Sequence, residues 1–334
     1  MDVFENFENQ LKANPKTIVF TEGTDARILS AASKLLAGKI LNVLLLGNPE
    51  AVKKAAAEGG FDITGAEICD PTSYPEFDAM VAKMVELRKG KMTEEQCRAA
   101  LSKSNYFGTM LVKMGKADAL LGGATYSTAD TVRPALQLVK TKPGAHLVSS
   151  VFIMVRGDEM LAMGDCAINI DYTDTVDKDG NVTFSAADKL AETGVACART
   201  AQVFGIEPKV AFLSYSTKGS GKGPNVDLAR EACAKAKALA PDLDIDGEMQ
   251  FDAAVSPTVG QLKFPGSKVA GYANTFIFPE IQSGNIGYKI AQRLGGFDAY
   301  GPILQGLNAP INDLSRGCNA EEVYQMSIIT AALA

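Results

Sequence analysis

Apolar residues are distributed along the first part of the chain in a strand and helix pattern. Short apolar runs at 17–20 and 41–46 indicate buried strands, whereas the segments at 25–37 and 51–58 have the periodicity of amphipathic helices. Continuous apolar runs are typical of parallel strands that are covered on both faces. The pattern therefore predicts an α/β fold with a parallel sheet.

The pattern changes near Pro143 and Gly144, where we place a crossing between two α/β domains. The runs at 147–155 and 159–169 alternate around a turn, as antiparallel strands do. Further strands are expected at 117–121, 208–214, 245–250, 269–272, 275–278 and 300–307, with helices at 2–13, 75–87, 93–101, 106–114, 186–204, 226–239 and 279–294. We expect residues 1–146 and 308–334 to form the first domain and residues 147–307 the second.

The stretch at 308–322 carries the densest group of reactive side chains. We expect it to connect the strand at 300–307 to the last helix, with Asn319 as the N-cap and Glu322 at the third helical position. A hydroxyl, a guanidinium, a thiol and a carboxylate then meet beside a helix N-terminus, from Ser315, Arg316, Cys318 and Glu322. This group suits a phosphorylated or acyl substrate, and the alternative is an ordinary capped surface helix.

Arginines at the ends of elements form a second set of candidates, because a guanidinium can bind phosphate oxygens through two hydrogen bonds. They are Arg88, Arg133, Arg293 and Arg316, and each alone can also be a solvated surface residue. Gly122, Gly123 and Ala124 end a strand before Ser127 and Thr128. That segment is either an anion cradle or an ordinary capped turn.

Two further motifs leave alternatives open. Cys318 is a candidate acyl-accepting nucleophile, because the helix N-terminus and Arg316 would lower its pKa, but the nearby carboxylate opposes a thiolate. The segment 219–223 resembles a phosphate-binding P-loop, yet Gly223 follows Lys222 where a magnesium-binding hydroxyl would stand. Two alternatives remain for this segment: a flexible, positively charged edge of a site for a nucleotide-bearing ligand, or a plain mobile loop.

Composition excludes several classes of protein. The chain has 334 residues and a net charge of -6, and no basic cluster could follow a nucleic-acid backbone. Its 6 cysteines form no CxxC pair and its single histidine is His146, which argues against a zinc site, a disulfide framework and a Ser-His-Asp triad. The first ten residues lack the features of a signal peptide, and no apolar run reaches the roughly 20 residues of a membrane span. We therefore expect a cytoplasmic protein.

Several motifs occur in one order over a matching length. They are ADALLGGA at 117–124 followed by STAD at 127–130 and Arg133, SYSTKGS at 214–220, GNIGYKIAQRL at 284–294, and NDLSRGC at 312–318. On these motifs, residues 16–334 resemble the phosphate acetyltransferase (phosphotransacetylase) family of the short, single-module type.

The resemblance implies a two-domain, isocitrate/isopropylmalate-dehydrogenase-like fold, a parallel-sheet sandwich with the active site in the interdomain cleft, in a homodimer. It implies reversible transfer of acetyl between coenzyme A and phosphate, with no metal and no permanently bound cofactor. Ternary-complex transfer by direct thiolate attack is the expected route. The alternatives are a phosphate butyryltransferase, a non-catalytic acyl-CoA-sensing module and, more distantly, a nicotinamide-dependent decarboxylating dehydrogenase.

The resemblance also implies roles for individual residues. Ser315, Arg316 and Glu322 match the catalytic positions, and we expect Arg88, Arg133, Ser127, Thr128 and Arg293 to bind substrate, the arginines by the resemblance and the two hydroxyls as part of the candidate anion cradle. The first four of these are expected to hold the phosphoryl group, whereas Arg293 would bind coenzyme A or act in cleft closure. The family usually has an aspartate where this chain has Glu322, so the adjacent Glu321 is the alternative base.

Overall fold

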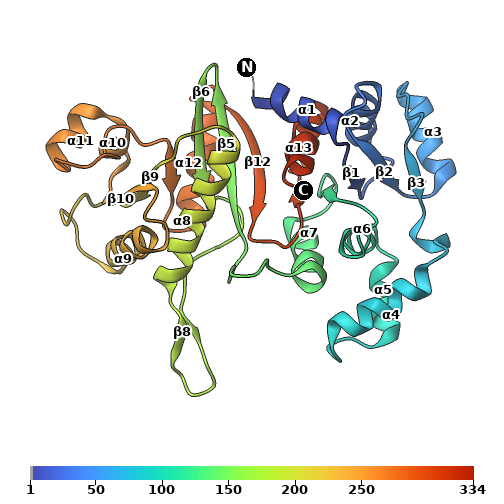
Figure 1. Ribbon diagram of the computed structural model, residues 1–334, viewed down its shortest axis with the longest axis horizontal. Helices are drawn as coiled ribbons and strands as arrows, with labels where there is room; N and C mark the ends of the chain where they lie inside the picture. Colours follow the sequence, from blue (N-terminus) through green and yellow to red (C-terminus); the bar gives the residue numbers. More distant parts are fainter. Residues whose placement is uncertain (1–2) are drawn as a thin grey trace. The chain divides into compact units, whose positions relative to one another are not determined.

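The computed structural model describes residues 3–334, which form two compact units (Figure 1). One unit runs to Gly144 and resumes over Leu307–Ala334, and the other is Ala145–Gly306. The predicted boundaries lie within two residues of these positions. Among residues 3–334, no helix has both the length and the apolar character that crossing a membrane requires.

The first unit contains a five-stranded sheet in which every pair is parallel, as predicted. The strand order is β13-β4-β1-β2-β3. The strands are β1 (Thr17–Phe20), β2 (Asn42–Leu46), β3 (Glu67–Cys69), β4 (Ala119–Gly122) and β13 (Ile311–Asp313). Their fully buried side chains, such as Ile18, Phe20 and Leu45, are the core of this unit and supply its main stabilisation.

The helices of this unit begin and end at clear sequence signals. They are α1 (Val3–Ala13), α2 (Ala26–Ala37), α3 (Pro49–Gly59), α4 (Phe77–Arg88), α5 (Glu94–Leu101), α6 (Ser104–Lys113), α7 (Thr128–Pro134) and α13 (Ala320–Ala332), with the short 3-10 helix η1 (Pro71–Ser73) and the π-helix η2 (Ala135–Val139). Asp25, Asn48 and Thr93 cap their helices through side-chain oxygens. Helix α13 packs against α1, α2 and β4.

The second unit is built on a six-stranded sheet in the order β10-β9-β11-β6-β5-β12. Its elements are β5 (Ser149–Arg156), β6 (Glu159–Gly164), β7 (Thr175–Val176), β8 (Val182–Phe184), α8 (Ala186–Val203), β9 (Lys209–Leu213), α9 (Pro224–Leu239), β10 (Asp244–Met249), α10 (Phe251–Val255), α11 (Pro257–Lys263), β11 (Thr275–Ile277), α12 (Ile281–Arg293) and β12 (Asp298–Gln305). Strands β5 and β6 pair antiparallel, as predicted, and β12 also pairs antiparallel with β5.

Three predicted elements need correction. The predicted strand at 269–272 is wrong, because Gly271 has a φ of +88° there and the segment forms turns. Strand β6 ends at Gly164 rather than at residue 169. The strand at 300–307 does not lead into the last helix, since it lies in the second unit as β12 and the separate strand β13 precedes α13.

The P-loop-like segment is organised by a buried carboxylate. Glu248 is 1% exposed and accepts hydrogen bonds from the Ser216 hydroxyl (2.9 Å) and the Gly219 N–H (2.7 Å). The Ser216 hydroxyl oxygen in turn accepts from the Gly221 N–H at 2.9 Å. Because these N–H groups already bind protein oxygens, the segment does not present them as a phosphate cradle.

Candidate active site

The site residues of the first unit gather where three neighbouring strands end. Strand β1 connects through β2 to β3 on one side, whereas β4 and β13 lie on its other side, so the direction of winding reverses between β1 and β4. Open α/β sheets bind ligands outside the carboxyl ends of their strands at such a reversal. The segments that follow β1, β4 and β13 are therefore the expected walls of a site.

The segment after β4 is bound by a carboxylate from the end of β1. Glu22 accepts hydrogen bonds from the N–H groups of Gly123 (3.1 Å) and Thr125 (3.0 Å) and from the Thr21 hydroxyl (2.8 Å). Burial raises the pKa of Glu22, and these hydrogen bonds oppose the rise. The predicted anion cradle is thus occupied by the protein's own carboxyl group, because the pairing of β1 with β4 brings Glu22 there.

A second buried carboxylate holds the start of α7. Asp313 is 1% exposed and accepts hydrogen bonds from the hydroxyls of Thr128 and Thr131, each at 2.6 Å. Burial raises the pKa of Asp313 to about 6, the two hydroxyls oppose this, and the charge of Glu22 adds to it. The predicted phosphate donors need correction here, since the Thr128 hydroxyl donates to Asp313 and the Ser127 hydroxyl donates to Asp130 at 2.7 Å.

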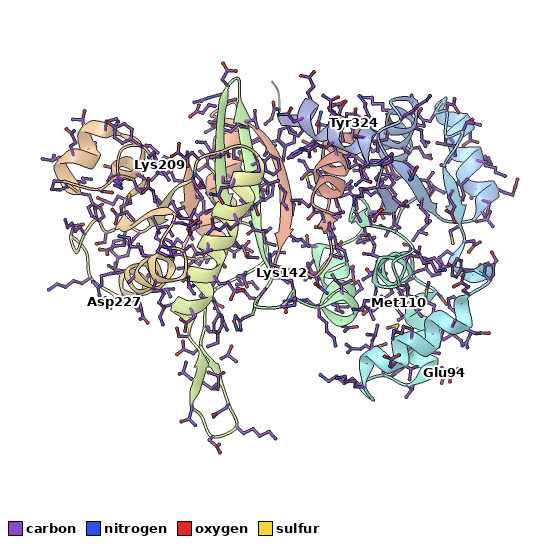
Figure 2. All side chains as sticks on the ribbon, in the orientation of Figure 1. Glu94, Met110, Lys142, Lys209, Asp227 and Tyr324 are labelled. Atoms are coloured by element: carbon purple, nitrogen blue, oxygen red, sulfur yellow. The ribbon has the colours of Figure 1, made fainter. Side chains whose placement is uncertain are left out.

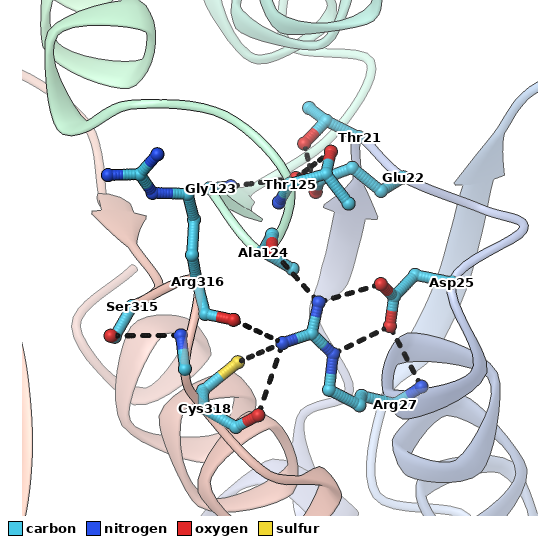
Figure 3. A network of polar contacts seen from close by, with 11 residues as sticks. Thr21, Glu22, Asp25, Arg27, Gly123, Ala124, Thr125, Ser315, Arg316 and Cys318 are labelled. Atoms are coloured by element: carbon cyan, nitrogen blue, oxygen red, sulfur yellow. Dashed lines mark hydrogen bonds and ion pairs between the residues drawn. The ribbon is translucent and has the colours of Figure 1, made fainter.

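Arg27 links the loops that follow β4 and β13 (Figure 3). Its guanidinium donates to the carbonyls of Ala124 (2.8 Å), Arg316 (2.8 Å) and Cys318 (3.2 Å). The sequence prediction missed Arg27, as well as Glu22 and Asp313. The local signal for Arg27 was an acidic N-cap, Asp25, followed by this basic residue at the start of the helix that follows β1.

Among residues 3–334, the side-chain donors of Ser315 and Arg316 bind no other group of the protein. The Ser315 oxygen accepts from the Gly317 N–H at 3.2 Å, which leaves the hydroxyl proton for a ligand. The Arg316 side chain is exposed and points away from Arg27 (Figure 3). Across residues 3–334, no carboxylate lies within ion-pair distance of its guanidinium. A hydroxyl and a guanidinium of the predicted catalytic set are therefore available together.

The predicted cap of α13 is confirmed. Asn319 accepts from the Glu322 N–H at 2.9 Å, and the Glu322 carboxylate accepts from the Asn319 N–H at 3.1 Å. Glu321 instead forms an ion pair with Lys34 of α2 at 2.8 Å, and this hydrogen bond lowers the pKa of Glu321. The geometry therefore favours Glu322 over Glu321 as the carboxylate that faces the loop carrying Ser315.

The thiol of Cys318 is not held in an activated state. Cys318 is 7% exposed, and burial raises its pKa, which the charge of Arg27 only partly opposes. The expectation that Arg316 lowers this pKa was wrong, because Arg27 is the guanidinium that contacts the sulfur, at 3.6 Å. A thiol with a raised pKa is a poor nucleophile, so the covalent alternative loses support.

Arg88 and Arg133 share a neighbourhood with Tyr106. Burial raises the pKa of Tyr106, and the positive charges of Arg133 and Arg88 oppose that rise. The Arg88 Nε is buried and has no hydrogen-bond partner among residues 3–334, whereas the Arg133 side chain is 60% exposed with Asp130 only at 4.0 Å. The two guanidiniums thus have spare hydrogen-bonding capacity for an anion.

Arg293 belongs to the other unit. It is the last residue of α12 and its side chain is exposed. It is therefore not among the residues that the first unit brings together, and its role toward coenzyme A stays a prediction.

One family of proteins matches this chain over nearly its whole length. Residues 2–331 match the family described as phosphate acetyl/butaryl transferase. A phosphate acetyltransferase of Bacillus subtilis (strain 168) is 51% identical over 333 residues, covering 100% of this chain and 99% of the relative.

Solved structures give the same result. A phosphotransacetylase from Streptococcus pyogenes is 52% identical with a TM-score of 0.92, and 99% of this chain and 97% of that chain are covered. A phosphotransacetylase from Staphylococcus aureus is 48% identical with a TM-score of 0.88, at 99% and 97% coverage. The chain therefore belongs to the phosphate acetyl/butaryl transferase family.

Proposed function

We propose that this protein catalyses the reversible transfer of an acetyl group between coenzyme A and phosphate. The observation that carries the proposal is the pair Ser315 and Arg316, whose donors are available at the carboxyl end of β13 beside the N-terminus of α13. Donors in this arrangement suit an oxyanion that develops during acyl transfer. Relatives that are 50% to 51% identical over the whole chain carry the name phosphate acetyltransferase.

The chemical step is direct attack within a ternary complex. The thiol of coenzyme A gives its proton to a carboxylate, and its sulfur forms a bond to the acetyl carbon of acetyl phosphate. The bond between that carbon and the bridging oxygen then breaks, and phosphate leaves with the electron pair. Arg316 and Ser315 stabilise the carbonyl oxygen, and binding both substrates together supplies much of the rate.

Glu322 is the proposed proton acceptor, and Glu322→Gln tests this role apart from helix capping. The glutamine carbonyl can still accept from the Asn319 N–H, so the cap is kept while the base is lost. We expect kcat to fall by about 10²-fold with little change in KM. Glu321→Gln is the matched control, and a larger loss of kcat in that variant would move the role to Glu321.

Arg133 is proposed to bind the phosphoryl group together with Arg88. Because a hydrogen bond to a charged group contributes about 1.5 to 3 kcal/mol, Arg133→Ala should raise the KM for acetyl phosphate by roughly 10- to 100-fold. Initial rates at varied acetyl phosphate and varied coenzyme A separate the two substrates. An increase confined to the KM for coenzyme A would contradict this assignment.

The remaining assignments complete the proposal. Coenzyme A and phosphate act as substrates rather than as permanently bound cofactors, Arg293 binds coenzyme A or acts in closure, and the protein works in the cytoplasm as a homodimer. The route is supported by the raised pKa of Cys318, which disfavours an acetyl-cysteine.

The test of the function is thioester formation from acetyl phosphate and coenzyme A, with butyryl phosphate in a parallel reaction. We expect faster turnover with the acetyl substrate. A preference for butyryl phosphate would assign a phosphate butyryltransferase, whereas binding of acetyl-CoA without any turnover would indicate an acyl-CoA-sensing module.

A further inference from the structure

Arg27 uses its whole guanidinium for contacts within the protein. Nε donates to one oxygen of Asp25 at 3.0 Å, and Nη2 donates to the other at 2.8 Å and to the Ala124 carbonyl at 2.8 Å. Nη1 donates to the carbonyls of Arg316 and Cys318 and contacts the Cys318 sulfur. A guanidinium has five N–H donors, and these contacts engage all of them. Arg27 therefore has no donor left for a substrate.

Asp25 fixes the direction of this guanidinium. It also accepts from the Arg27 backbone N–H at 2.9 Å and is the N-cap of α2, so the ion pair is anchored to a helix end. The hydrogen bond from Arg27 lowers the pKa of Asp25. The pair stays charged at neutral pH, and the two-pronged contact determines where the remaining donors point.

The carbonyls that Arg27 binds belong to the residues around the available donors. One is the carbonyl of Arg316 itself, which follows Ser315, and another is that of Ala124, in the loop that Glu22 binds (Figure 3). A backbone that shifts moves its side chain with it. A misplacement of about 1 Å in a reacting group can lower the rate about 10²-fold.

We propose that Arg27 is a positioning residue, which holds the loop of Ser315 and Arg316 against the loop that follows β4 without touching the substrates. The inference deepens the proposed function and rests on it. Lysine keeps the positive charge at this position but has no planar fork, so it cannot hold Asp25 and the carbonyls of both loops at once.

The experiment compares Arg27→Lys with a matched variant, Arg156→Lys. Arg156 makes the same kind of contacts in the second unit, with two hydrogen bonds to Glu159 and one from Nη1 to the Gly295 carbonyl at 2.8 Å. We expect Arg27→Lys to lower kcat by about 10²-fold, with KM for both substrates within about threefold of wild type. Arg156→Lys should leave kcat unchanged.

A double-mutant cycle with Arg316→Ala separates positioning from general destabilisation. If Arg27 acts through Arg316, Arg27→Lys costs less than about threefold in kcat once Arg316 is alanine. A full loss of about 10²-fold in that background, or equal losses in the Arg27 and Arg156 variants, would overturn the proposal.

Alkylation of Cys318 by N-ethylmaleimide, followed by peptide mass spectrometry, measures how accessible the loop of Ser315 and Arg316 is. This measurement does not depend on turnover. We expect labelling to rise on the order of 10-fold in Arg27→Lys and not in Arg156→Lys, and unchanged labelling would contradict the proposal. If wild type forms no thioester, the proposed function fails, and the labelling alone decides the role of Arg27. If Arg27→Lys does not fold, Asp25→Asn releases the same anchor, and the same outcomes apply.

Discussion

Replacing Arg316 by alanine is expected to lower kcat by about 10²- to 10³-fold, the usual effect of removing one donor from an oxyanion site. The exposed guanidinium follows Ser315 directly, and its backbone carbonyl is held by Arg27 at 2.8 Å. Its loss should affect the transition state more than the bound substrates, so kcat and kcat/KM fall together. Steady-state rates of thioester formation measure this.

Arg316→Lys and Arg230→Ala are the comparison variants. Lysine restores the charge without the planar fork, so we expect partial recovery of kcat. Arg230 lies on α9 in the other unit and is paired with Asp227, and its removal should leave the rate unchanged. Wild-type kcat in Arg316→Ala would contradict the assignment of this side chain.

Asp313→Asn is expected to change how stability depends on pH. The pKa of Asp313 in the folded protein is about 6, above its ordinary value of 3.8, because the carboxyl group is buried. The folded state then holds the proton more tightly than the unfolded state does. The stability contributed by the protonated form is complete below the ordinary pKa and is lost as pH rises through about 6.

The asparagine variant has no such ionisation. Its amide oxygen can accept from one of the two threonine hydroxyls, of Thr128 and Thr131, and its NH2 group can donate to the oxygen of the other. We therefore expect the free energy of unfolding of Asp313→Asn, relative to wild type, to rise by on the order of 3 kcal/mol between about pH 4 and pH 7. Urea unfolding at several pH values measures this. The exposed Asp62 has a lowered pKa, mainly through its hydrogen bond with Thr64, so Asp62→Asn should show no such rise. Parallel curves for wild type and Asp313→Asn would contradict the argument.

The sequence predicted those parts of the fold that local patterns encode. The apolar runs of β1 and β2 and the capping signal of α13 are each encoded by a few consecutive residues, so periodicity and cap chemistry were sufficient to predict them. Strand β13 was missed because Ile311–Asp313 is three residues long and polar in part, and only its pairing with β4 makes it a strand. The apolar segment at 269–272 was misread because its turn depends on the backbone at Gly271.

From the sequence, candidate site residues could be grouped only where one motif holds them together. Ser315, Arg316 and the capping pair of Asn319 and Glu322 are within eight positions of one another. Glu22 and Arg27 were missed because their partners lie about 100 and 290 positions away, and only the strand order of the sheet brings them together. The same long-range contacts explain why the sequence assigned the wrong guanidinium to Cys318.

The most direct test of the account is exchange of isotopically labelled phosphate into acetyl phosphate, with and without coenzyme A. Direct transfer requires coenzyme A to take the acetyl group before labelled phosphate can receive it. We therefore predict exchange only when coenzyme A is present. Exchange without coenzyme A would show an acetyl-enzyme and contradict direct attack, whereas no exchange in its presence would contradict the proposed transfer itself.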